Sequence, residues 1–306
     1  MMKYGYATIL MCVVLALPVH AQETGLNFLR IGANAAAGAM GDAQVAGTRD
    51  AFATYWNPAG LASAPFNSAA VSHRIWLADM RAYDVAARFR VGRNGGLGLA
   101  LTAVDSGDLE VRDAPGDPDG VFSAQFISVG LSYGRQVGPL RAGVTAKYLS
   151  EQIFEQTATG YAFDAGVQVG VLGDKLLFGA ALQNVGKMNK LAGEASTLPK
   201  TLRVGTAFSP FRILAENDGS TLLDVLLAAE VSHLFPGETT RFHAGGGVEV
   251  LDLVVLRAGI ITNDALRNVT FGGGLHYGAF FFDYAFLPFE SGFEGPGHVL
   301  TLHYTW

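Results

Sequence analysis

The stretch His298-Val-Leu-Thr-Leu-His-Tyr-Thr-Trp306 at the end of the chain decides the predicted fold. Side chains of a strand point alternately to its two faces. One face then carries Leu300, Leu302, Tyr304 and Trp306, and the other carries Val299, Thr301, His303 and Thr305. A terminal strand that alternates in this way and ends on an aromatic residue is typical of a transmembrane β-barrel of the bacterial outer membrane.

The start of the chain predicts a secretory signal peptide over residues 1–21. It contains Lys3, an apolar run from Ala7 to Leu17, and the small-residue cleavage site Val19-His20-Ala21. We therefore expect cleavage near Ala21 and localisation in the bacterial outer membrane.

The composition agrees with a barrel and excludes several function classes. Half of the residues are hydrophobic (50%), yet no apolar run after the signal approaches the roughly 20 residues of a spanning helix. The single cysteine, Cys12, lies in the predicted signal, so we expect no thiol chemistry in the mature chain. A net charge of -6 without a basic run argues against nucleic acid as a partner.

From about Asn67 onward the chain divides into short alternating segments separated by turn residues. These predict an all-β fold, a transmembrane antiparallel β-barrel of about 14 strands that occupies residues 67–306. The predicted strands are 67–77, 82–91, 95–104, 122–136, 139–150, 159–171, 175–186, 200–209, 222–233, 240–250, 253–262, 267–277, 279–287 and 298–306. Their connections alternate between short and long, as do the periplasmic turns and outer loops of such barrels.

The charged residues of these strands fall on the face predicted to line the lumen, and their two signs nearly balance. They are Asp84, Arg88, Arg90, Arg141, Lys147, Asp164, Arg203, Asp224, Glu230, Arg241, Glu249, Arg257 and Asp283. A selective ion pore favours one sign. Near-balance instead predicts ion pairs across the lumen that hold a plug.

Residues 22–66 differ from the strands and predict that plug. Gly32 to Ala43 is rich in small residues, and Asp50 to Leu61 predicts a short helix that ends at Asn57-Pro58. The lumen of a wide barrel needs filling, and small residues permit close approach to its wall. The alternative is a periplasmic tail.

The stretch Gly38-Ala-Met-Gly-Asp-Ala-Gln-Val-Ala-Gly-Thr-Arg-Asp-Ala-Phe-Ala-Thr-Tyr-Trp-Asn-Pro-Ala-Gly-Leu61 resembles the PorV/PorQ family of outer-membrane proteins in the FadL-like transporter superfamily. Ala39 stands where the family usually has glycine. The residues that carry the plug motif are Gly38, Gly41, Asp50, Tyr55, Trp56, Asn57, Pro58 and Ala59. Further similar stretches are His73–Trp76, Leu182–Gly186 and Leu198–Gly205.

The resemblance implies a fourteen-stranded barrel with an N-terminal hatch and leaves two functions open. PorV-like members work with type IX secretion machinery, and their partners are exported proteins with C-terminal sorting domains and subunits of that machinery. FadL-like members pass hydrophobic ligands through the barrel wall. A purely structural barrel in outer-membrane lipid is the third alternative. If the chain has the PorV-like role, we expect its partner contacts in the outer loops 105–121, 187–199 and 288–297.

Local motifs add one candidate gate and no catalytic site. Gly95, Gly96 and Gly98 predict either a flexible strand start or a kink that opens the wall sideways. The histidines show no metalloprotease spacing, so we expect no metal, no cofactor and no enzyme activity. The carboxylates of Asp113 to Gly120 predict a solvated loop tip, with weak calcium binding as the alternative.

Overall fold

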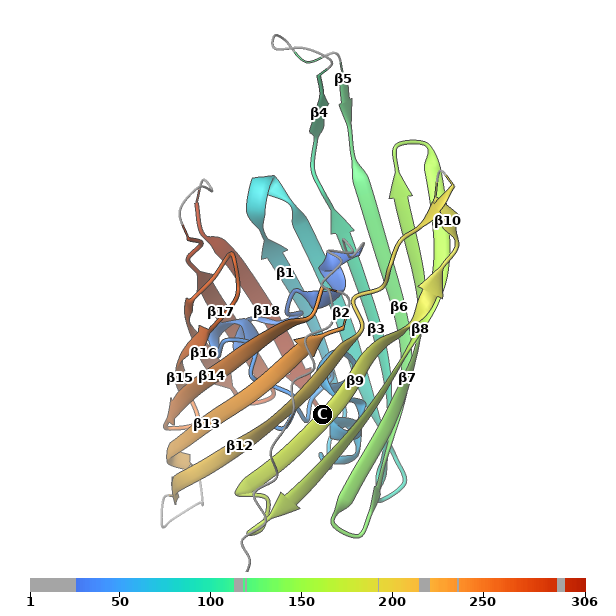
Figure 1. Ribbon diagram of the computed structural model, residues 1–306. Helices are drawn as coiled ribbons and strands as arrows, with labels where there is room; N and C mark the ends of the chain where they lie inside the picture. The colour runs from blue at the N-terminus through green and yellow to red at the C-terminus, as the bar shows by residue number, and fades with distance from the viewer. Residues whose placement is uncertain are drawn as a thin grey trace, which may run out of the picture.

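The structure is a computed structural model that describes residues 26–112, 118, 120–191, 193–214, 221–235, 237–290 and 295–306. Fourteen of its strands form one closed antiparallel barrel (Figure 1). They are β1 (Ser68–Ile75), β2 (Arg81–Val91), β3 (Gly95–Asp105), β6 (Ala124–Val137), β7 (Leu140–Ile153), β8 (Gln156–Val171), β9 (Leu176–Met188), β12 (Thr201–Leu214), β13 (Thr221–Leu234), β14 (Thr239–Val250), β15 (Val254–Ile261), β16 (Val269–Tyr277), β17 (Phe280–Leu287) and β18 (Gly297–Thr305).

The predicted barrel is confirmed, and each predicted strand overlaps one barrel strand. The barrel closes where β1 pairs with the terminal strand β18, with Ser68 opposite Thr305. The predicted signal peptide and loop positions 113–117, 119 and 291–294 lie outside the described residues.

The strands form a barrel because their two faces suit different surroundings. On β2 the outward side chains of Tyr83 and Val85 are 50% and 44% exposed, whereas the inward side chains of Asp84 and Arg88 are buried. Large apolar side chains point outward on the other barrel strands too. A hydrocarbon surround stabilises such a surface, whereas water would not.

Two small hairpins extend the outer loops beyond the barrel. β4 (Leu109–Val111) pairs with β5 (Gly120–Phe122), and β10 (Lys190–Leu191) pairs with β11 (Glu194–Ala195). Figure 1 shows the β4–β5 hairpin standing well above the rim. Both hairpins lie in segments that the sequence predicts as loops.

The N-terminal segment folds inside the barrel as short helical pieces joined by turns (Figure 1). Its elements are η1 (Asn27–Arg30), α1 (Ala35–Ala39), α2 (Ala53–Trp56) and η2 (Pro58–Ala62), and η3 (Leu77–Asp79) follows β1. No helix in the described ranges is long and apolar enough to cross a membrane.

The short helix predicted within Asp50 to Leu61 ends at Asn57-Pro58 as expected, and it spans Ala53–Trp56. The chain breaks at Asn57, whose φ of -162° and ψ of 107° are extended, and it continues as the 3-10 helix η2. The cause is Pro58, because a proline disfavours the helical conformation of the residue before it.

The ion pairs predicted to cross the lumen also need correction. Arg74 on β1 pairs with Asp84 on β2 at 2.9 Å, and Lys147 on β7 pairs with Asp164 on β8 at 2.7 Å. Arg257 on β15 reaches Asp283 on β17 at 2.5 Å by passing over β16. Adjacent strands lie only about 5 Å apart, whereas the opposite wall is a whole barrel diameter away, so these wall charges meet partners on nearby strands.

Candidate functional site

The Asn57 side chain is the hub of the plug motif and is completely buried. Its amide nitrogen donates to the carbonyl of Val45 at 2.7 Å and to that of Val167 on β8 at 3.1 Å. Its side-chain oxygen accepts from the Ala59 amide at 3.1 Å and so starts the helix η2. One side chain therefore joins two parts of the plug to each other and to the wall.

Tyr55 and Trp56 hold the preceding part of the plug. The Tyr55 hydroxyl lies 2.7 Å from the Ile31 carbonyl, and burial raises the pKa of this phenol above its ordinary value. The indole of Trp56 donates to the side-chain oxygen of Asn34 at 2.9 Å. The guanidinium of Arg203 lies over the Trp56 ring at 4.9 Å, which places a wall cation against the plug.

The other motif residues shape the plug backbone. The Asp50 carboxylate accepts from the Phe52 amide at 2.8 Å, just before α2. Gly41 has a φ of +66°, a conformation that favours glycine. Gly38 packs against the wall, since a Cβ there would lie 3.7 Å from Ala285 and Leu287.

A belt of inward-facing glycines on nine strands lets the plug lie directly against the wall. A Cβ on Gly134 would lie 2.6 Å from the Pro58 carbonyl oxygen, and one on Gly143 would lie 2.6 Å from the Ala59 nitrogen. Contacts this short cannot be made without movement, so only glycine fits. The glycine belt consists of Gly96, Gly98, Gly134, Gly143, Gly166, Gly179, Gly205, Gly245, Gly259 and Gly272.

Polar side chains of the wall satisfy the backbone of the plug. The Glu230 carboxylate accepts from the amides of Gln44 and Val45 at 2.9 and 2.8 Å. The Arg88 guanidinium donates to the carbonyls of Leu61 and Ala64. Buried backbone groups need such partners, so these side chains fix where the plug sits.

Sequence reasoning missed other anchors, of which Gln183 on β9 is the clearest. Its amide donates to the carbonyls of Tyr55 and Trp56 at 2.6 and 3.2 Å. Gln168 on β8 lies 3.2 Å from the Ala46 carbonyl in the same way. Both are side-chain amides at inward-facing strand positions close to a belt glycine. This pattern in the sequence could have predicted them as anchors.

An outer loop also reaches the plug. Arg267, between β15 and β16, contacts Asp42 of the plug at 2.9 Å and Asp264 of its own loop at 3.4 Å, and all three side chains are buried. Its guanidinium lies over the Trp76 ring at 5.1 Å, and Trp76 packs edge-on against Phe289. We call the Asp42–Arg267–Asp264 group the latch.

The outer half of the lumen contains an apolar cluster that the N-terminal segment fills. Leu26, Phe28 and Leu29 are buried there against wall residues that include Leu149 and Met188. Apolar side chains of the plug therefore occupy the apolar part of the lumen.

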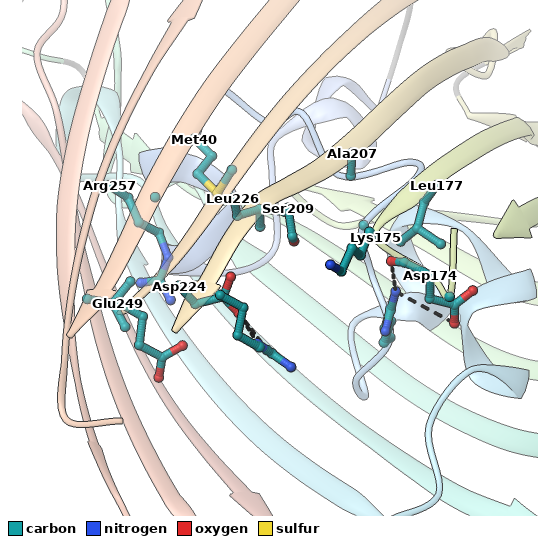
Figure 2. Close-up of a pocket in the computed structure, with 16 residues that line it drawn as sticks. Met40, Asp174, Lys175, Leu177, Ala207, Ser209, Asp224, Leu226, Glu249 and Arg257 are labelled. Atoms are coloured by element: carbon teal, nitrogen blue, oxygen red, sulfur yellow. Dashed lines mark hydrogen bonds and ion pairs between the residues drawn. The ribbon is translucent and has the colours of Figure 1, made fainter. Parts of the chain in front are cut away.

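The opposite half holds a cavity of about 390 Å³ below the plug. Figure 2 shows Arg257, Asp224 and Glu249 on one side of it and Lys175 and Asp174 on the other. Asp174 and Lys175 belong to the tight turn between β8 and β9, so the cavity lies at the barrel end that carries the short turns. In outer-membrane barrels this is the periplasmic end.

The candidate gate glycines lie in an unbroken part of the wall. Residues 95–105 of β3 pair continuously with β2 on one side and with β6 on the other. Gly96 and Gly98 belong to the glycine belt, against Leu61 and Thr54 of the plug. Gly95 begins the strand near Tyr133 of β6.

Two histidines of the wall hydrogen-bond to the plug backbone and to a wall carboxylate. His243 lies 2.7 Å from the Gly41 carbonyl, and His276 lies 2.8 Å from Glu249. In the described ranges, no group of three or more histidines, cysteines or carboxylates is placed to hold a metal ion.

The family model of the type IX secretion system protein PorV matches residues 19–234, which is more than half of the chain. The chain belongs to the PorV family. No curated protein sequence matches it. The matched region contains the plug, the glycines of β3 to β12 and the anchors Gln183 and Glu230 of this PorV-family barrel.

Solved structures with the same fold include hydrocarbon channels. The CymD monoaromatic hydrocarbon channel has a TM-score of 0.61 and 13% identity, over 92% of this chain and 98% of that chain. The toluene transporter TbuX of Ralstonia pickettii has a TM-score of 0.62 and 14% identity, over 89% and 97%. A FadL homologue of Pseudomonas aeruginosa has a TM-score of 0.54 and 13% identity, over 89% and 98%. At this identity the likeness shows that the PorV-family barrel has a FadL-like fold.

Proposed function

We propose that this PorV-family barrel is an accessory or shuttle subunit for the export of proteins and their attachment to the cell surface, in a type IX-like secretion system. The observation that carries the proposal is the filled lumen, where the plug lies against glycines of nine strands. A barrel sealed in this way suits a carrier or scaffold better than an aqueous pore. The family match supports the same role.

The outer loops are the proposed contact surface for exported proteins and secretion subunits. The β4–β5 hairpin projects from the rim (Figure 1), and Val111 and Val121 on it are exposed. Its two strands pair only with each other among the described strands, so both edges can accept a strand of a partner. The segments 187–199 and 288–297 complete this surface.

The test is deletion of the gene in its native host, followed by mass spectrometry of surface and medium proteins. A shuttle predicts that proteins sharing a C-terminal sorting domain are lost from the surface and accumulate in the periplasm. Complementation with a chain that lacks residues 109–122 tests the hairpin, provided that this variant still inserts as a folded barrel. An unchanged set of surface proteins after gene deletion would rule out the export role.

A FadL-like conduit for hydrophobic molecules is the second candidate. The apolar cluster around Leu26, Phe28 and Leu29 favours it, because such a lining suits a hydrophobic ligand once the segment moves. The fold it shares with hydrocarbon channels points the same way. In this candidate the wall would open at Gly95, Gly96 and Gly98.

A disulfide across the wall separates the two candidates. Leu99 on β3 and Leu131 on β6 are paired in register and point outward, so the double variant Leu99→Cys/Leu131→Cys would lock these strands together. A conduit predicts that toluene uptake falls on oxidation and returns with reductant, whereas protein export stays intact. The matched control Val144→Cys/Ala165→Cys locks β7 to β8, away from Gly95, Gly96 and Gly98 of β3. If the wild type takes up no toluene, the conduit hypothesis is wrong. If the deletion strain shows unchanged export and unchanged uptake, a purely structural barrel is the remaining hypothesis.

A further inference from the structure

The cavity at the end with the short turns carries an uneven distribution of charge. The Asp174 carboxylate accepts from Arg141 at 2.5 Å, and Arg49 of the plug approaches the same oxygen only to 3.9 Å. Lys175 is the next residue, and its ammonium has no ion-pair or hydrogen-bond partner among the described residues. Three cations therefore share one carboxylate on this side of the cavity.

The carboxylates on the opposite side contact basic groups of their own, although Oδ1 of Asp224 has no hydrogen-bond partner among the described residues. Asp224 pairs with Arg212 at 2.5 Å, and Asp283 pairs with Arg257 at 2.5 Å. Glu249 contacts His276 at 2.8 Å. The surplus positive charge thus stays with Arg49 and Lys175, which both line the cavity. Figure 2 shows the Lys175 side chain facing the open space.

The surroundings of Arg49 show the same surplus. Burial lowers the pKa of its guanidinium below the ordinary value, Asp174 counteracts this, and the like charges of Arg141 and Arg212 lower the pKa further. A second anion beside Arg49 would relieve this repulsion. The side chain is 38% exposed, so an anion from solution can reach it.

We propose that this cavity binds carboxylate groups of a peptide chain that enters from the periplasmic side, with Arg49 and Lys175 as the recognition residues. Guanidinium and ammonium groups donate charge-assisted hydrogen bonds to carboxylates. A volume of about 390 Å³ falls within the range of small-ligand pockets and holds a short peptide segment. The site is separate from the outer loops and does not depend on the export role.

The experiment is titration calorimetry on the purified full chain in detergent. The probe is a blocked hexapeptide of alternating glutamate and glycine, and the reference peptide has glutamine in place of glutamate. Citrate, as a third ligand, tests whether a free small carboxylate is the better occupant. We expect the glutamate peptide to bind more tightly than the glutamine peptide, and its affinity to fall with added salt.

The variant Arg49→Gln/Lys175→Gln should bind the glutamate peptide roughly tenfold more weakly, from the loss of two half-exposed charge contacts. The control Lys187→Gln/Lys190→Gln removes the same charge at the outer end of the barrel and should bind as the wild type does. Heat-modifiable migration on gels verifies that each variant is a folded barrel. In a second readout, the bound peptide should protect Lys175, and not Lys190, from an amine-reactive reagent.

Three outcomes would overturn the proposal. They are equal affinity for the two peptides, equal weakening in both double variants, and acetylation of Lys175 that the peptide does not slow. Binding of citrate without binding of the glutamate peptide would overturn the peptide as the occupant. Competition between citrate and the peptide supports a shared carboxylate site.

Discussion

At the scale of single residues, two features hold the plug. Glycines of the wall let it approach closely, and buried polar side chains hydrogen-bond to its backbone. Glycines of the belt leave no atom between wall and plug, and Asn57 uses both ends of its amide. Such positions tolerate little change, because an added atom collides and a removed one leaves a buried carbonyl unpaired.

Gly143→Ala tests the belt. The new Cβ would collide with Pro58 and Ala59, so we expect a loss of about 1–3 kcal/mol in unfolding free energy and a displaced plug. Denaturant unfolding and single-channel conductance in planar bilayers measure the two effects. Gly130→Ala is the control, since its Cβ would meet Thr145 at an ordinary 3.5 Å. Equal behaviour of the two variants would contradict a belt that seals the lumen.

At the scale of elements, the latch links an outer loop to the plug. The loop between β15 and β16 inserts Arg267 beside Asp42, far from it in sequence, so the plug and the outer surface share one buried ion-pair network. A partner that engages this loop can therefore act on the plug.

Arg267→Gln should loosen the plug strongly, because it leaves the buried Asp42 carboxylate without its Arg267 partner, whereas Asp264 keeps Arg241 at 3.2 Å. Removing one member of a buried pair typically costs about 3–5 kcal/mol. Hydrogen exchange of residues 38–48 measures the loosening. Arg112→Gln removes an arginine from the exposed pair with Glu110 and should change stability by about 1 kcal/mol or less. The latch idea fails if exchange in the plug is the same in both variants.

The latch should also respond to acid. Burial alone would raise the pKa of Asp264, but Arg267 and Arg241 outweigh it and hold the pKa below the ordinary value. The stabilisation is therefore present above the unfolded-state pKa of about 3.9 and is lost as the pH falls through the lower folded value. Because Arg267 lies over Trp76, tryptophan emission during acid titration should report the loss. An Asp264→Asn variant should lack this transition.

At the scale of the whole molecule, the apolar exterior and the sealed interior make a membrane barrel that is closed at mid-height. Leu131, in the middle of β6, is 56% exposed and points outward. Leu131→Arg should destabilise the barrel in a bilayer by about 2–4 kcal/mol. Folding titrations in lipid vesicles measure this. Val121→Arg, on the hairpin above the rim, should have no such effect, and equal losses would contradict the membrane position of β6.

The number of strands, the direction in which their side chains face and the closing of the ring by β18 were predictable from the sequence alone, because strand alternation has a period of two residues and is visible locally. The sequence also indicated a plug, since small residues and Asn57-Pro58 stand apart from the strand pattern. The paired hairpin β4–β5 lay beyond such reasoning, because three-residue strands carry no alternation to read.

Which groups meet inside the lumen could not be predicted from the sequence, because it depends on how the plug packs in the barrel. Arg267 and Asp42 are separated by most of the barrel in sequence, and Gln183 looks like any polar strand residue until the Tyr55 carbonyl lies beside it. Charge balance predicted ion pairs but not their partners, because the partners depend on which strands are neighbours and on their register in the barrel. The surplus of charge beside Asp174 has the same origin: the plug brings Arg49 to a turn that already holds Arg141 and Lys175.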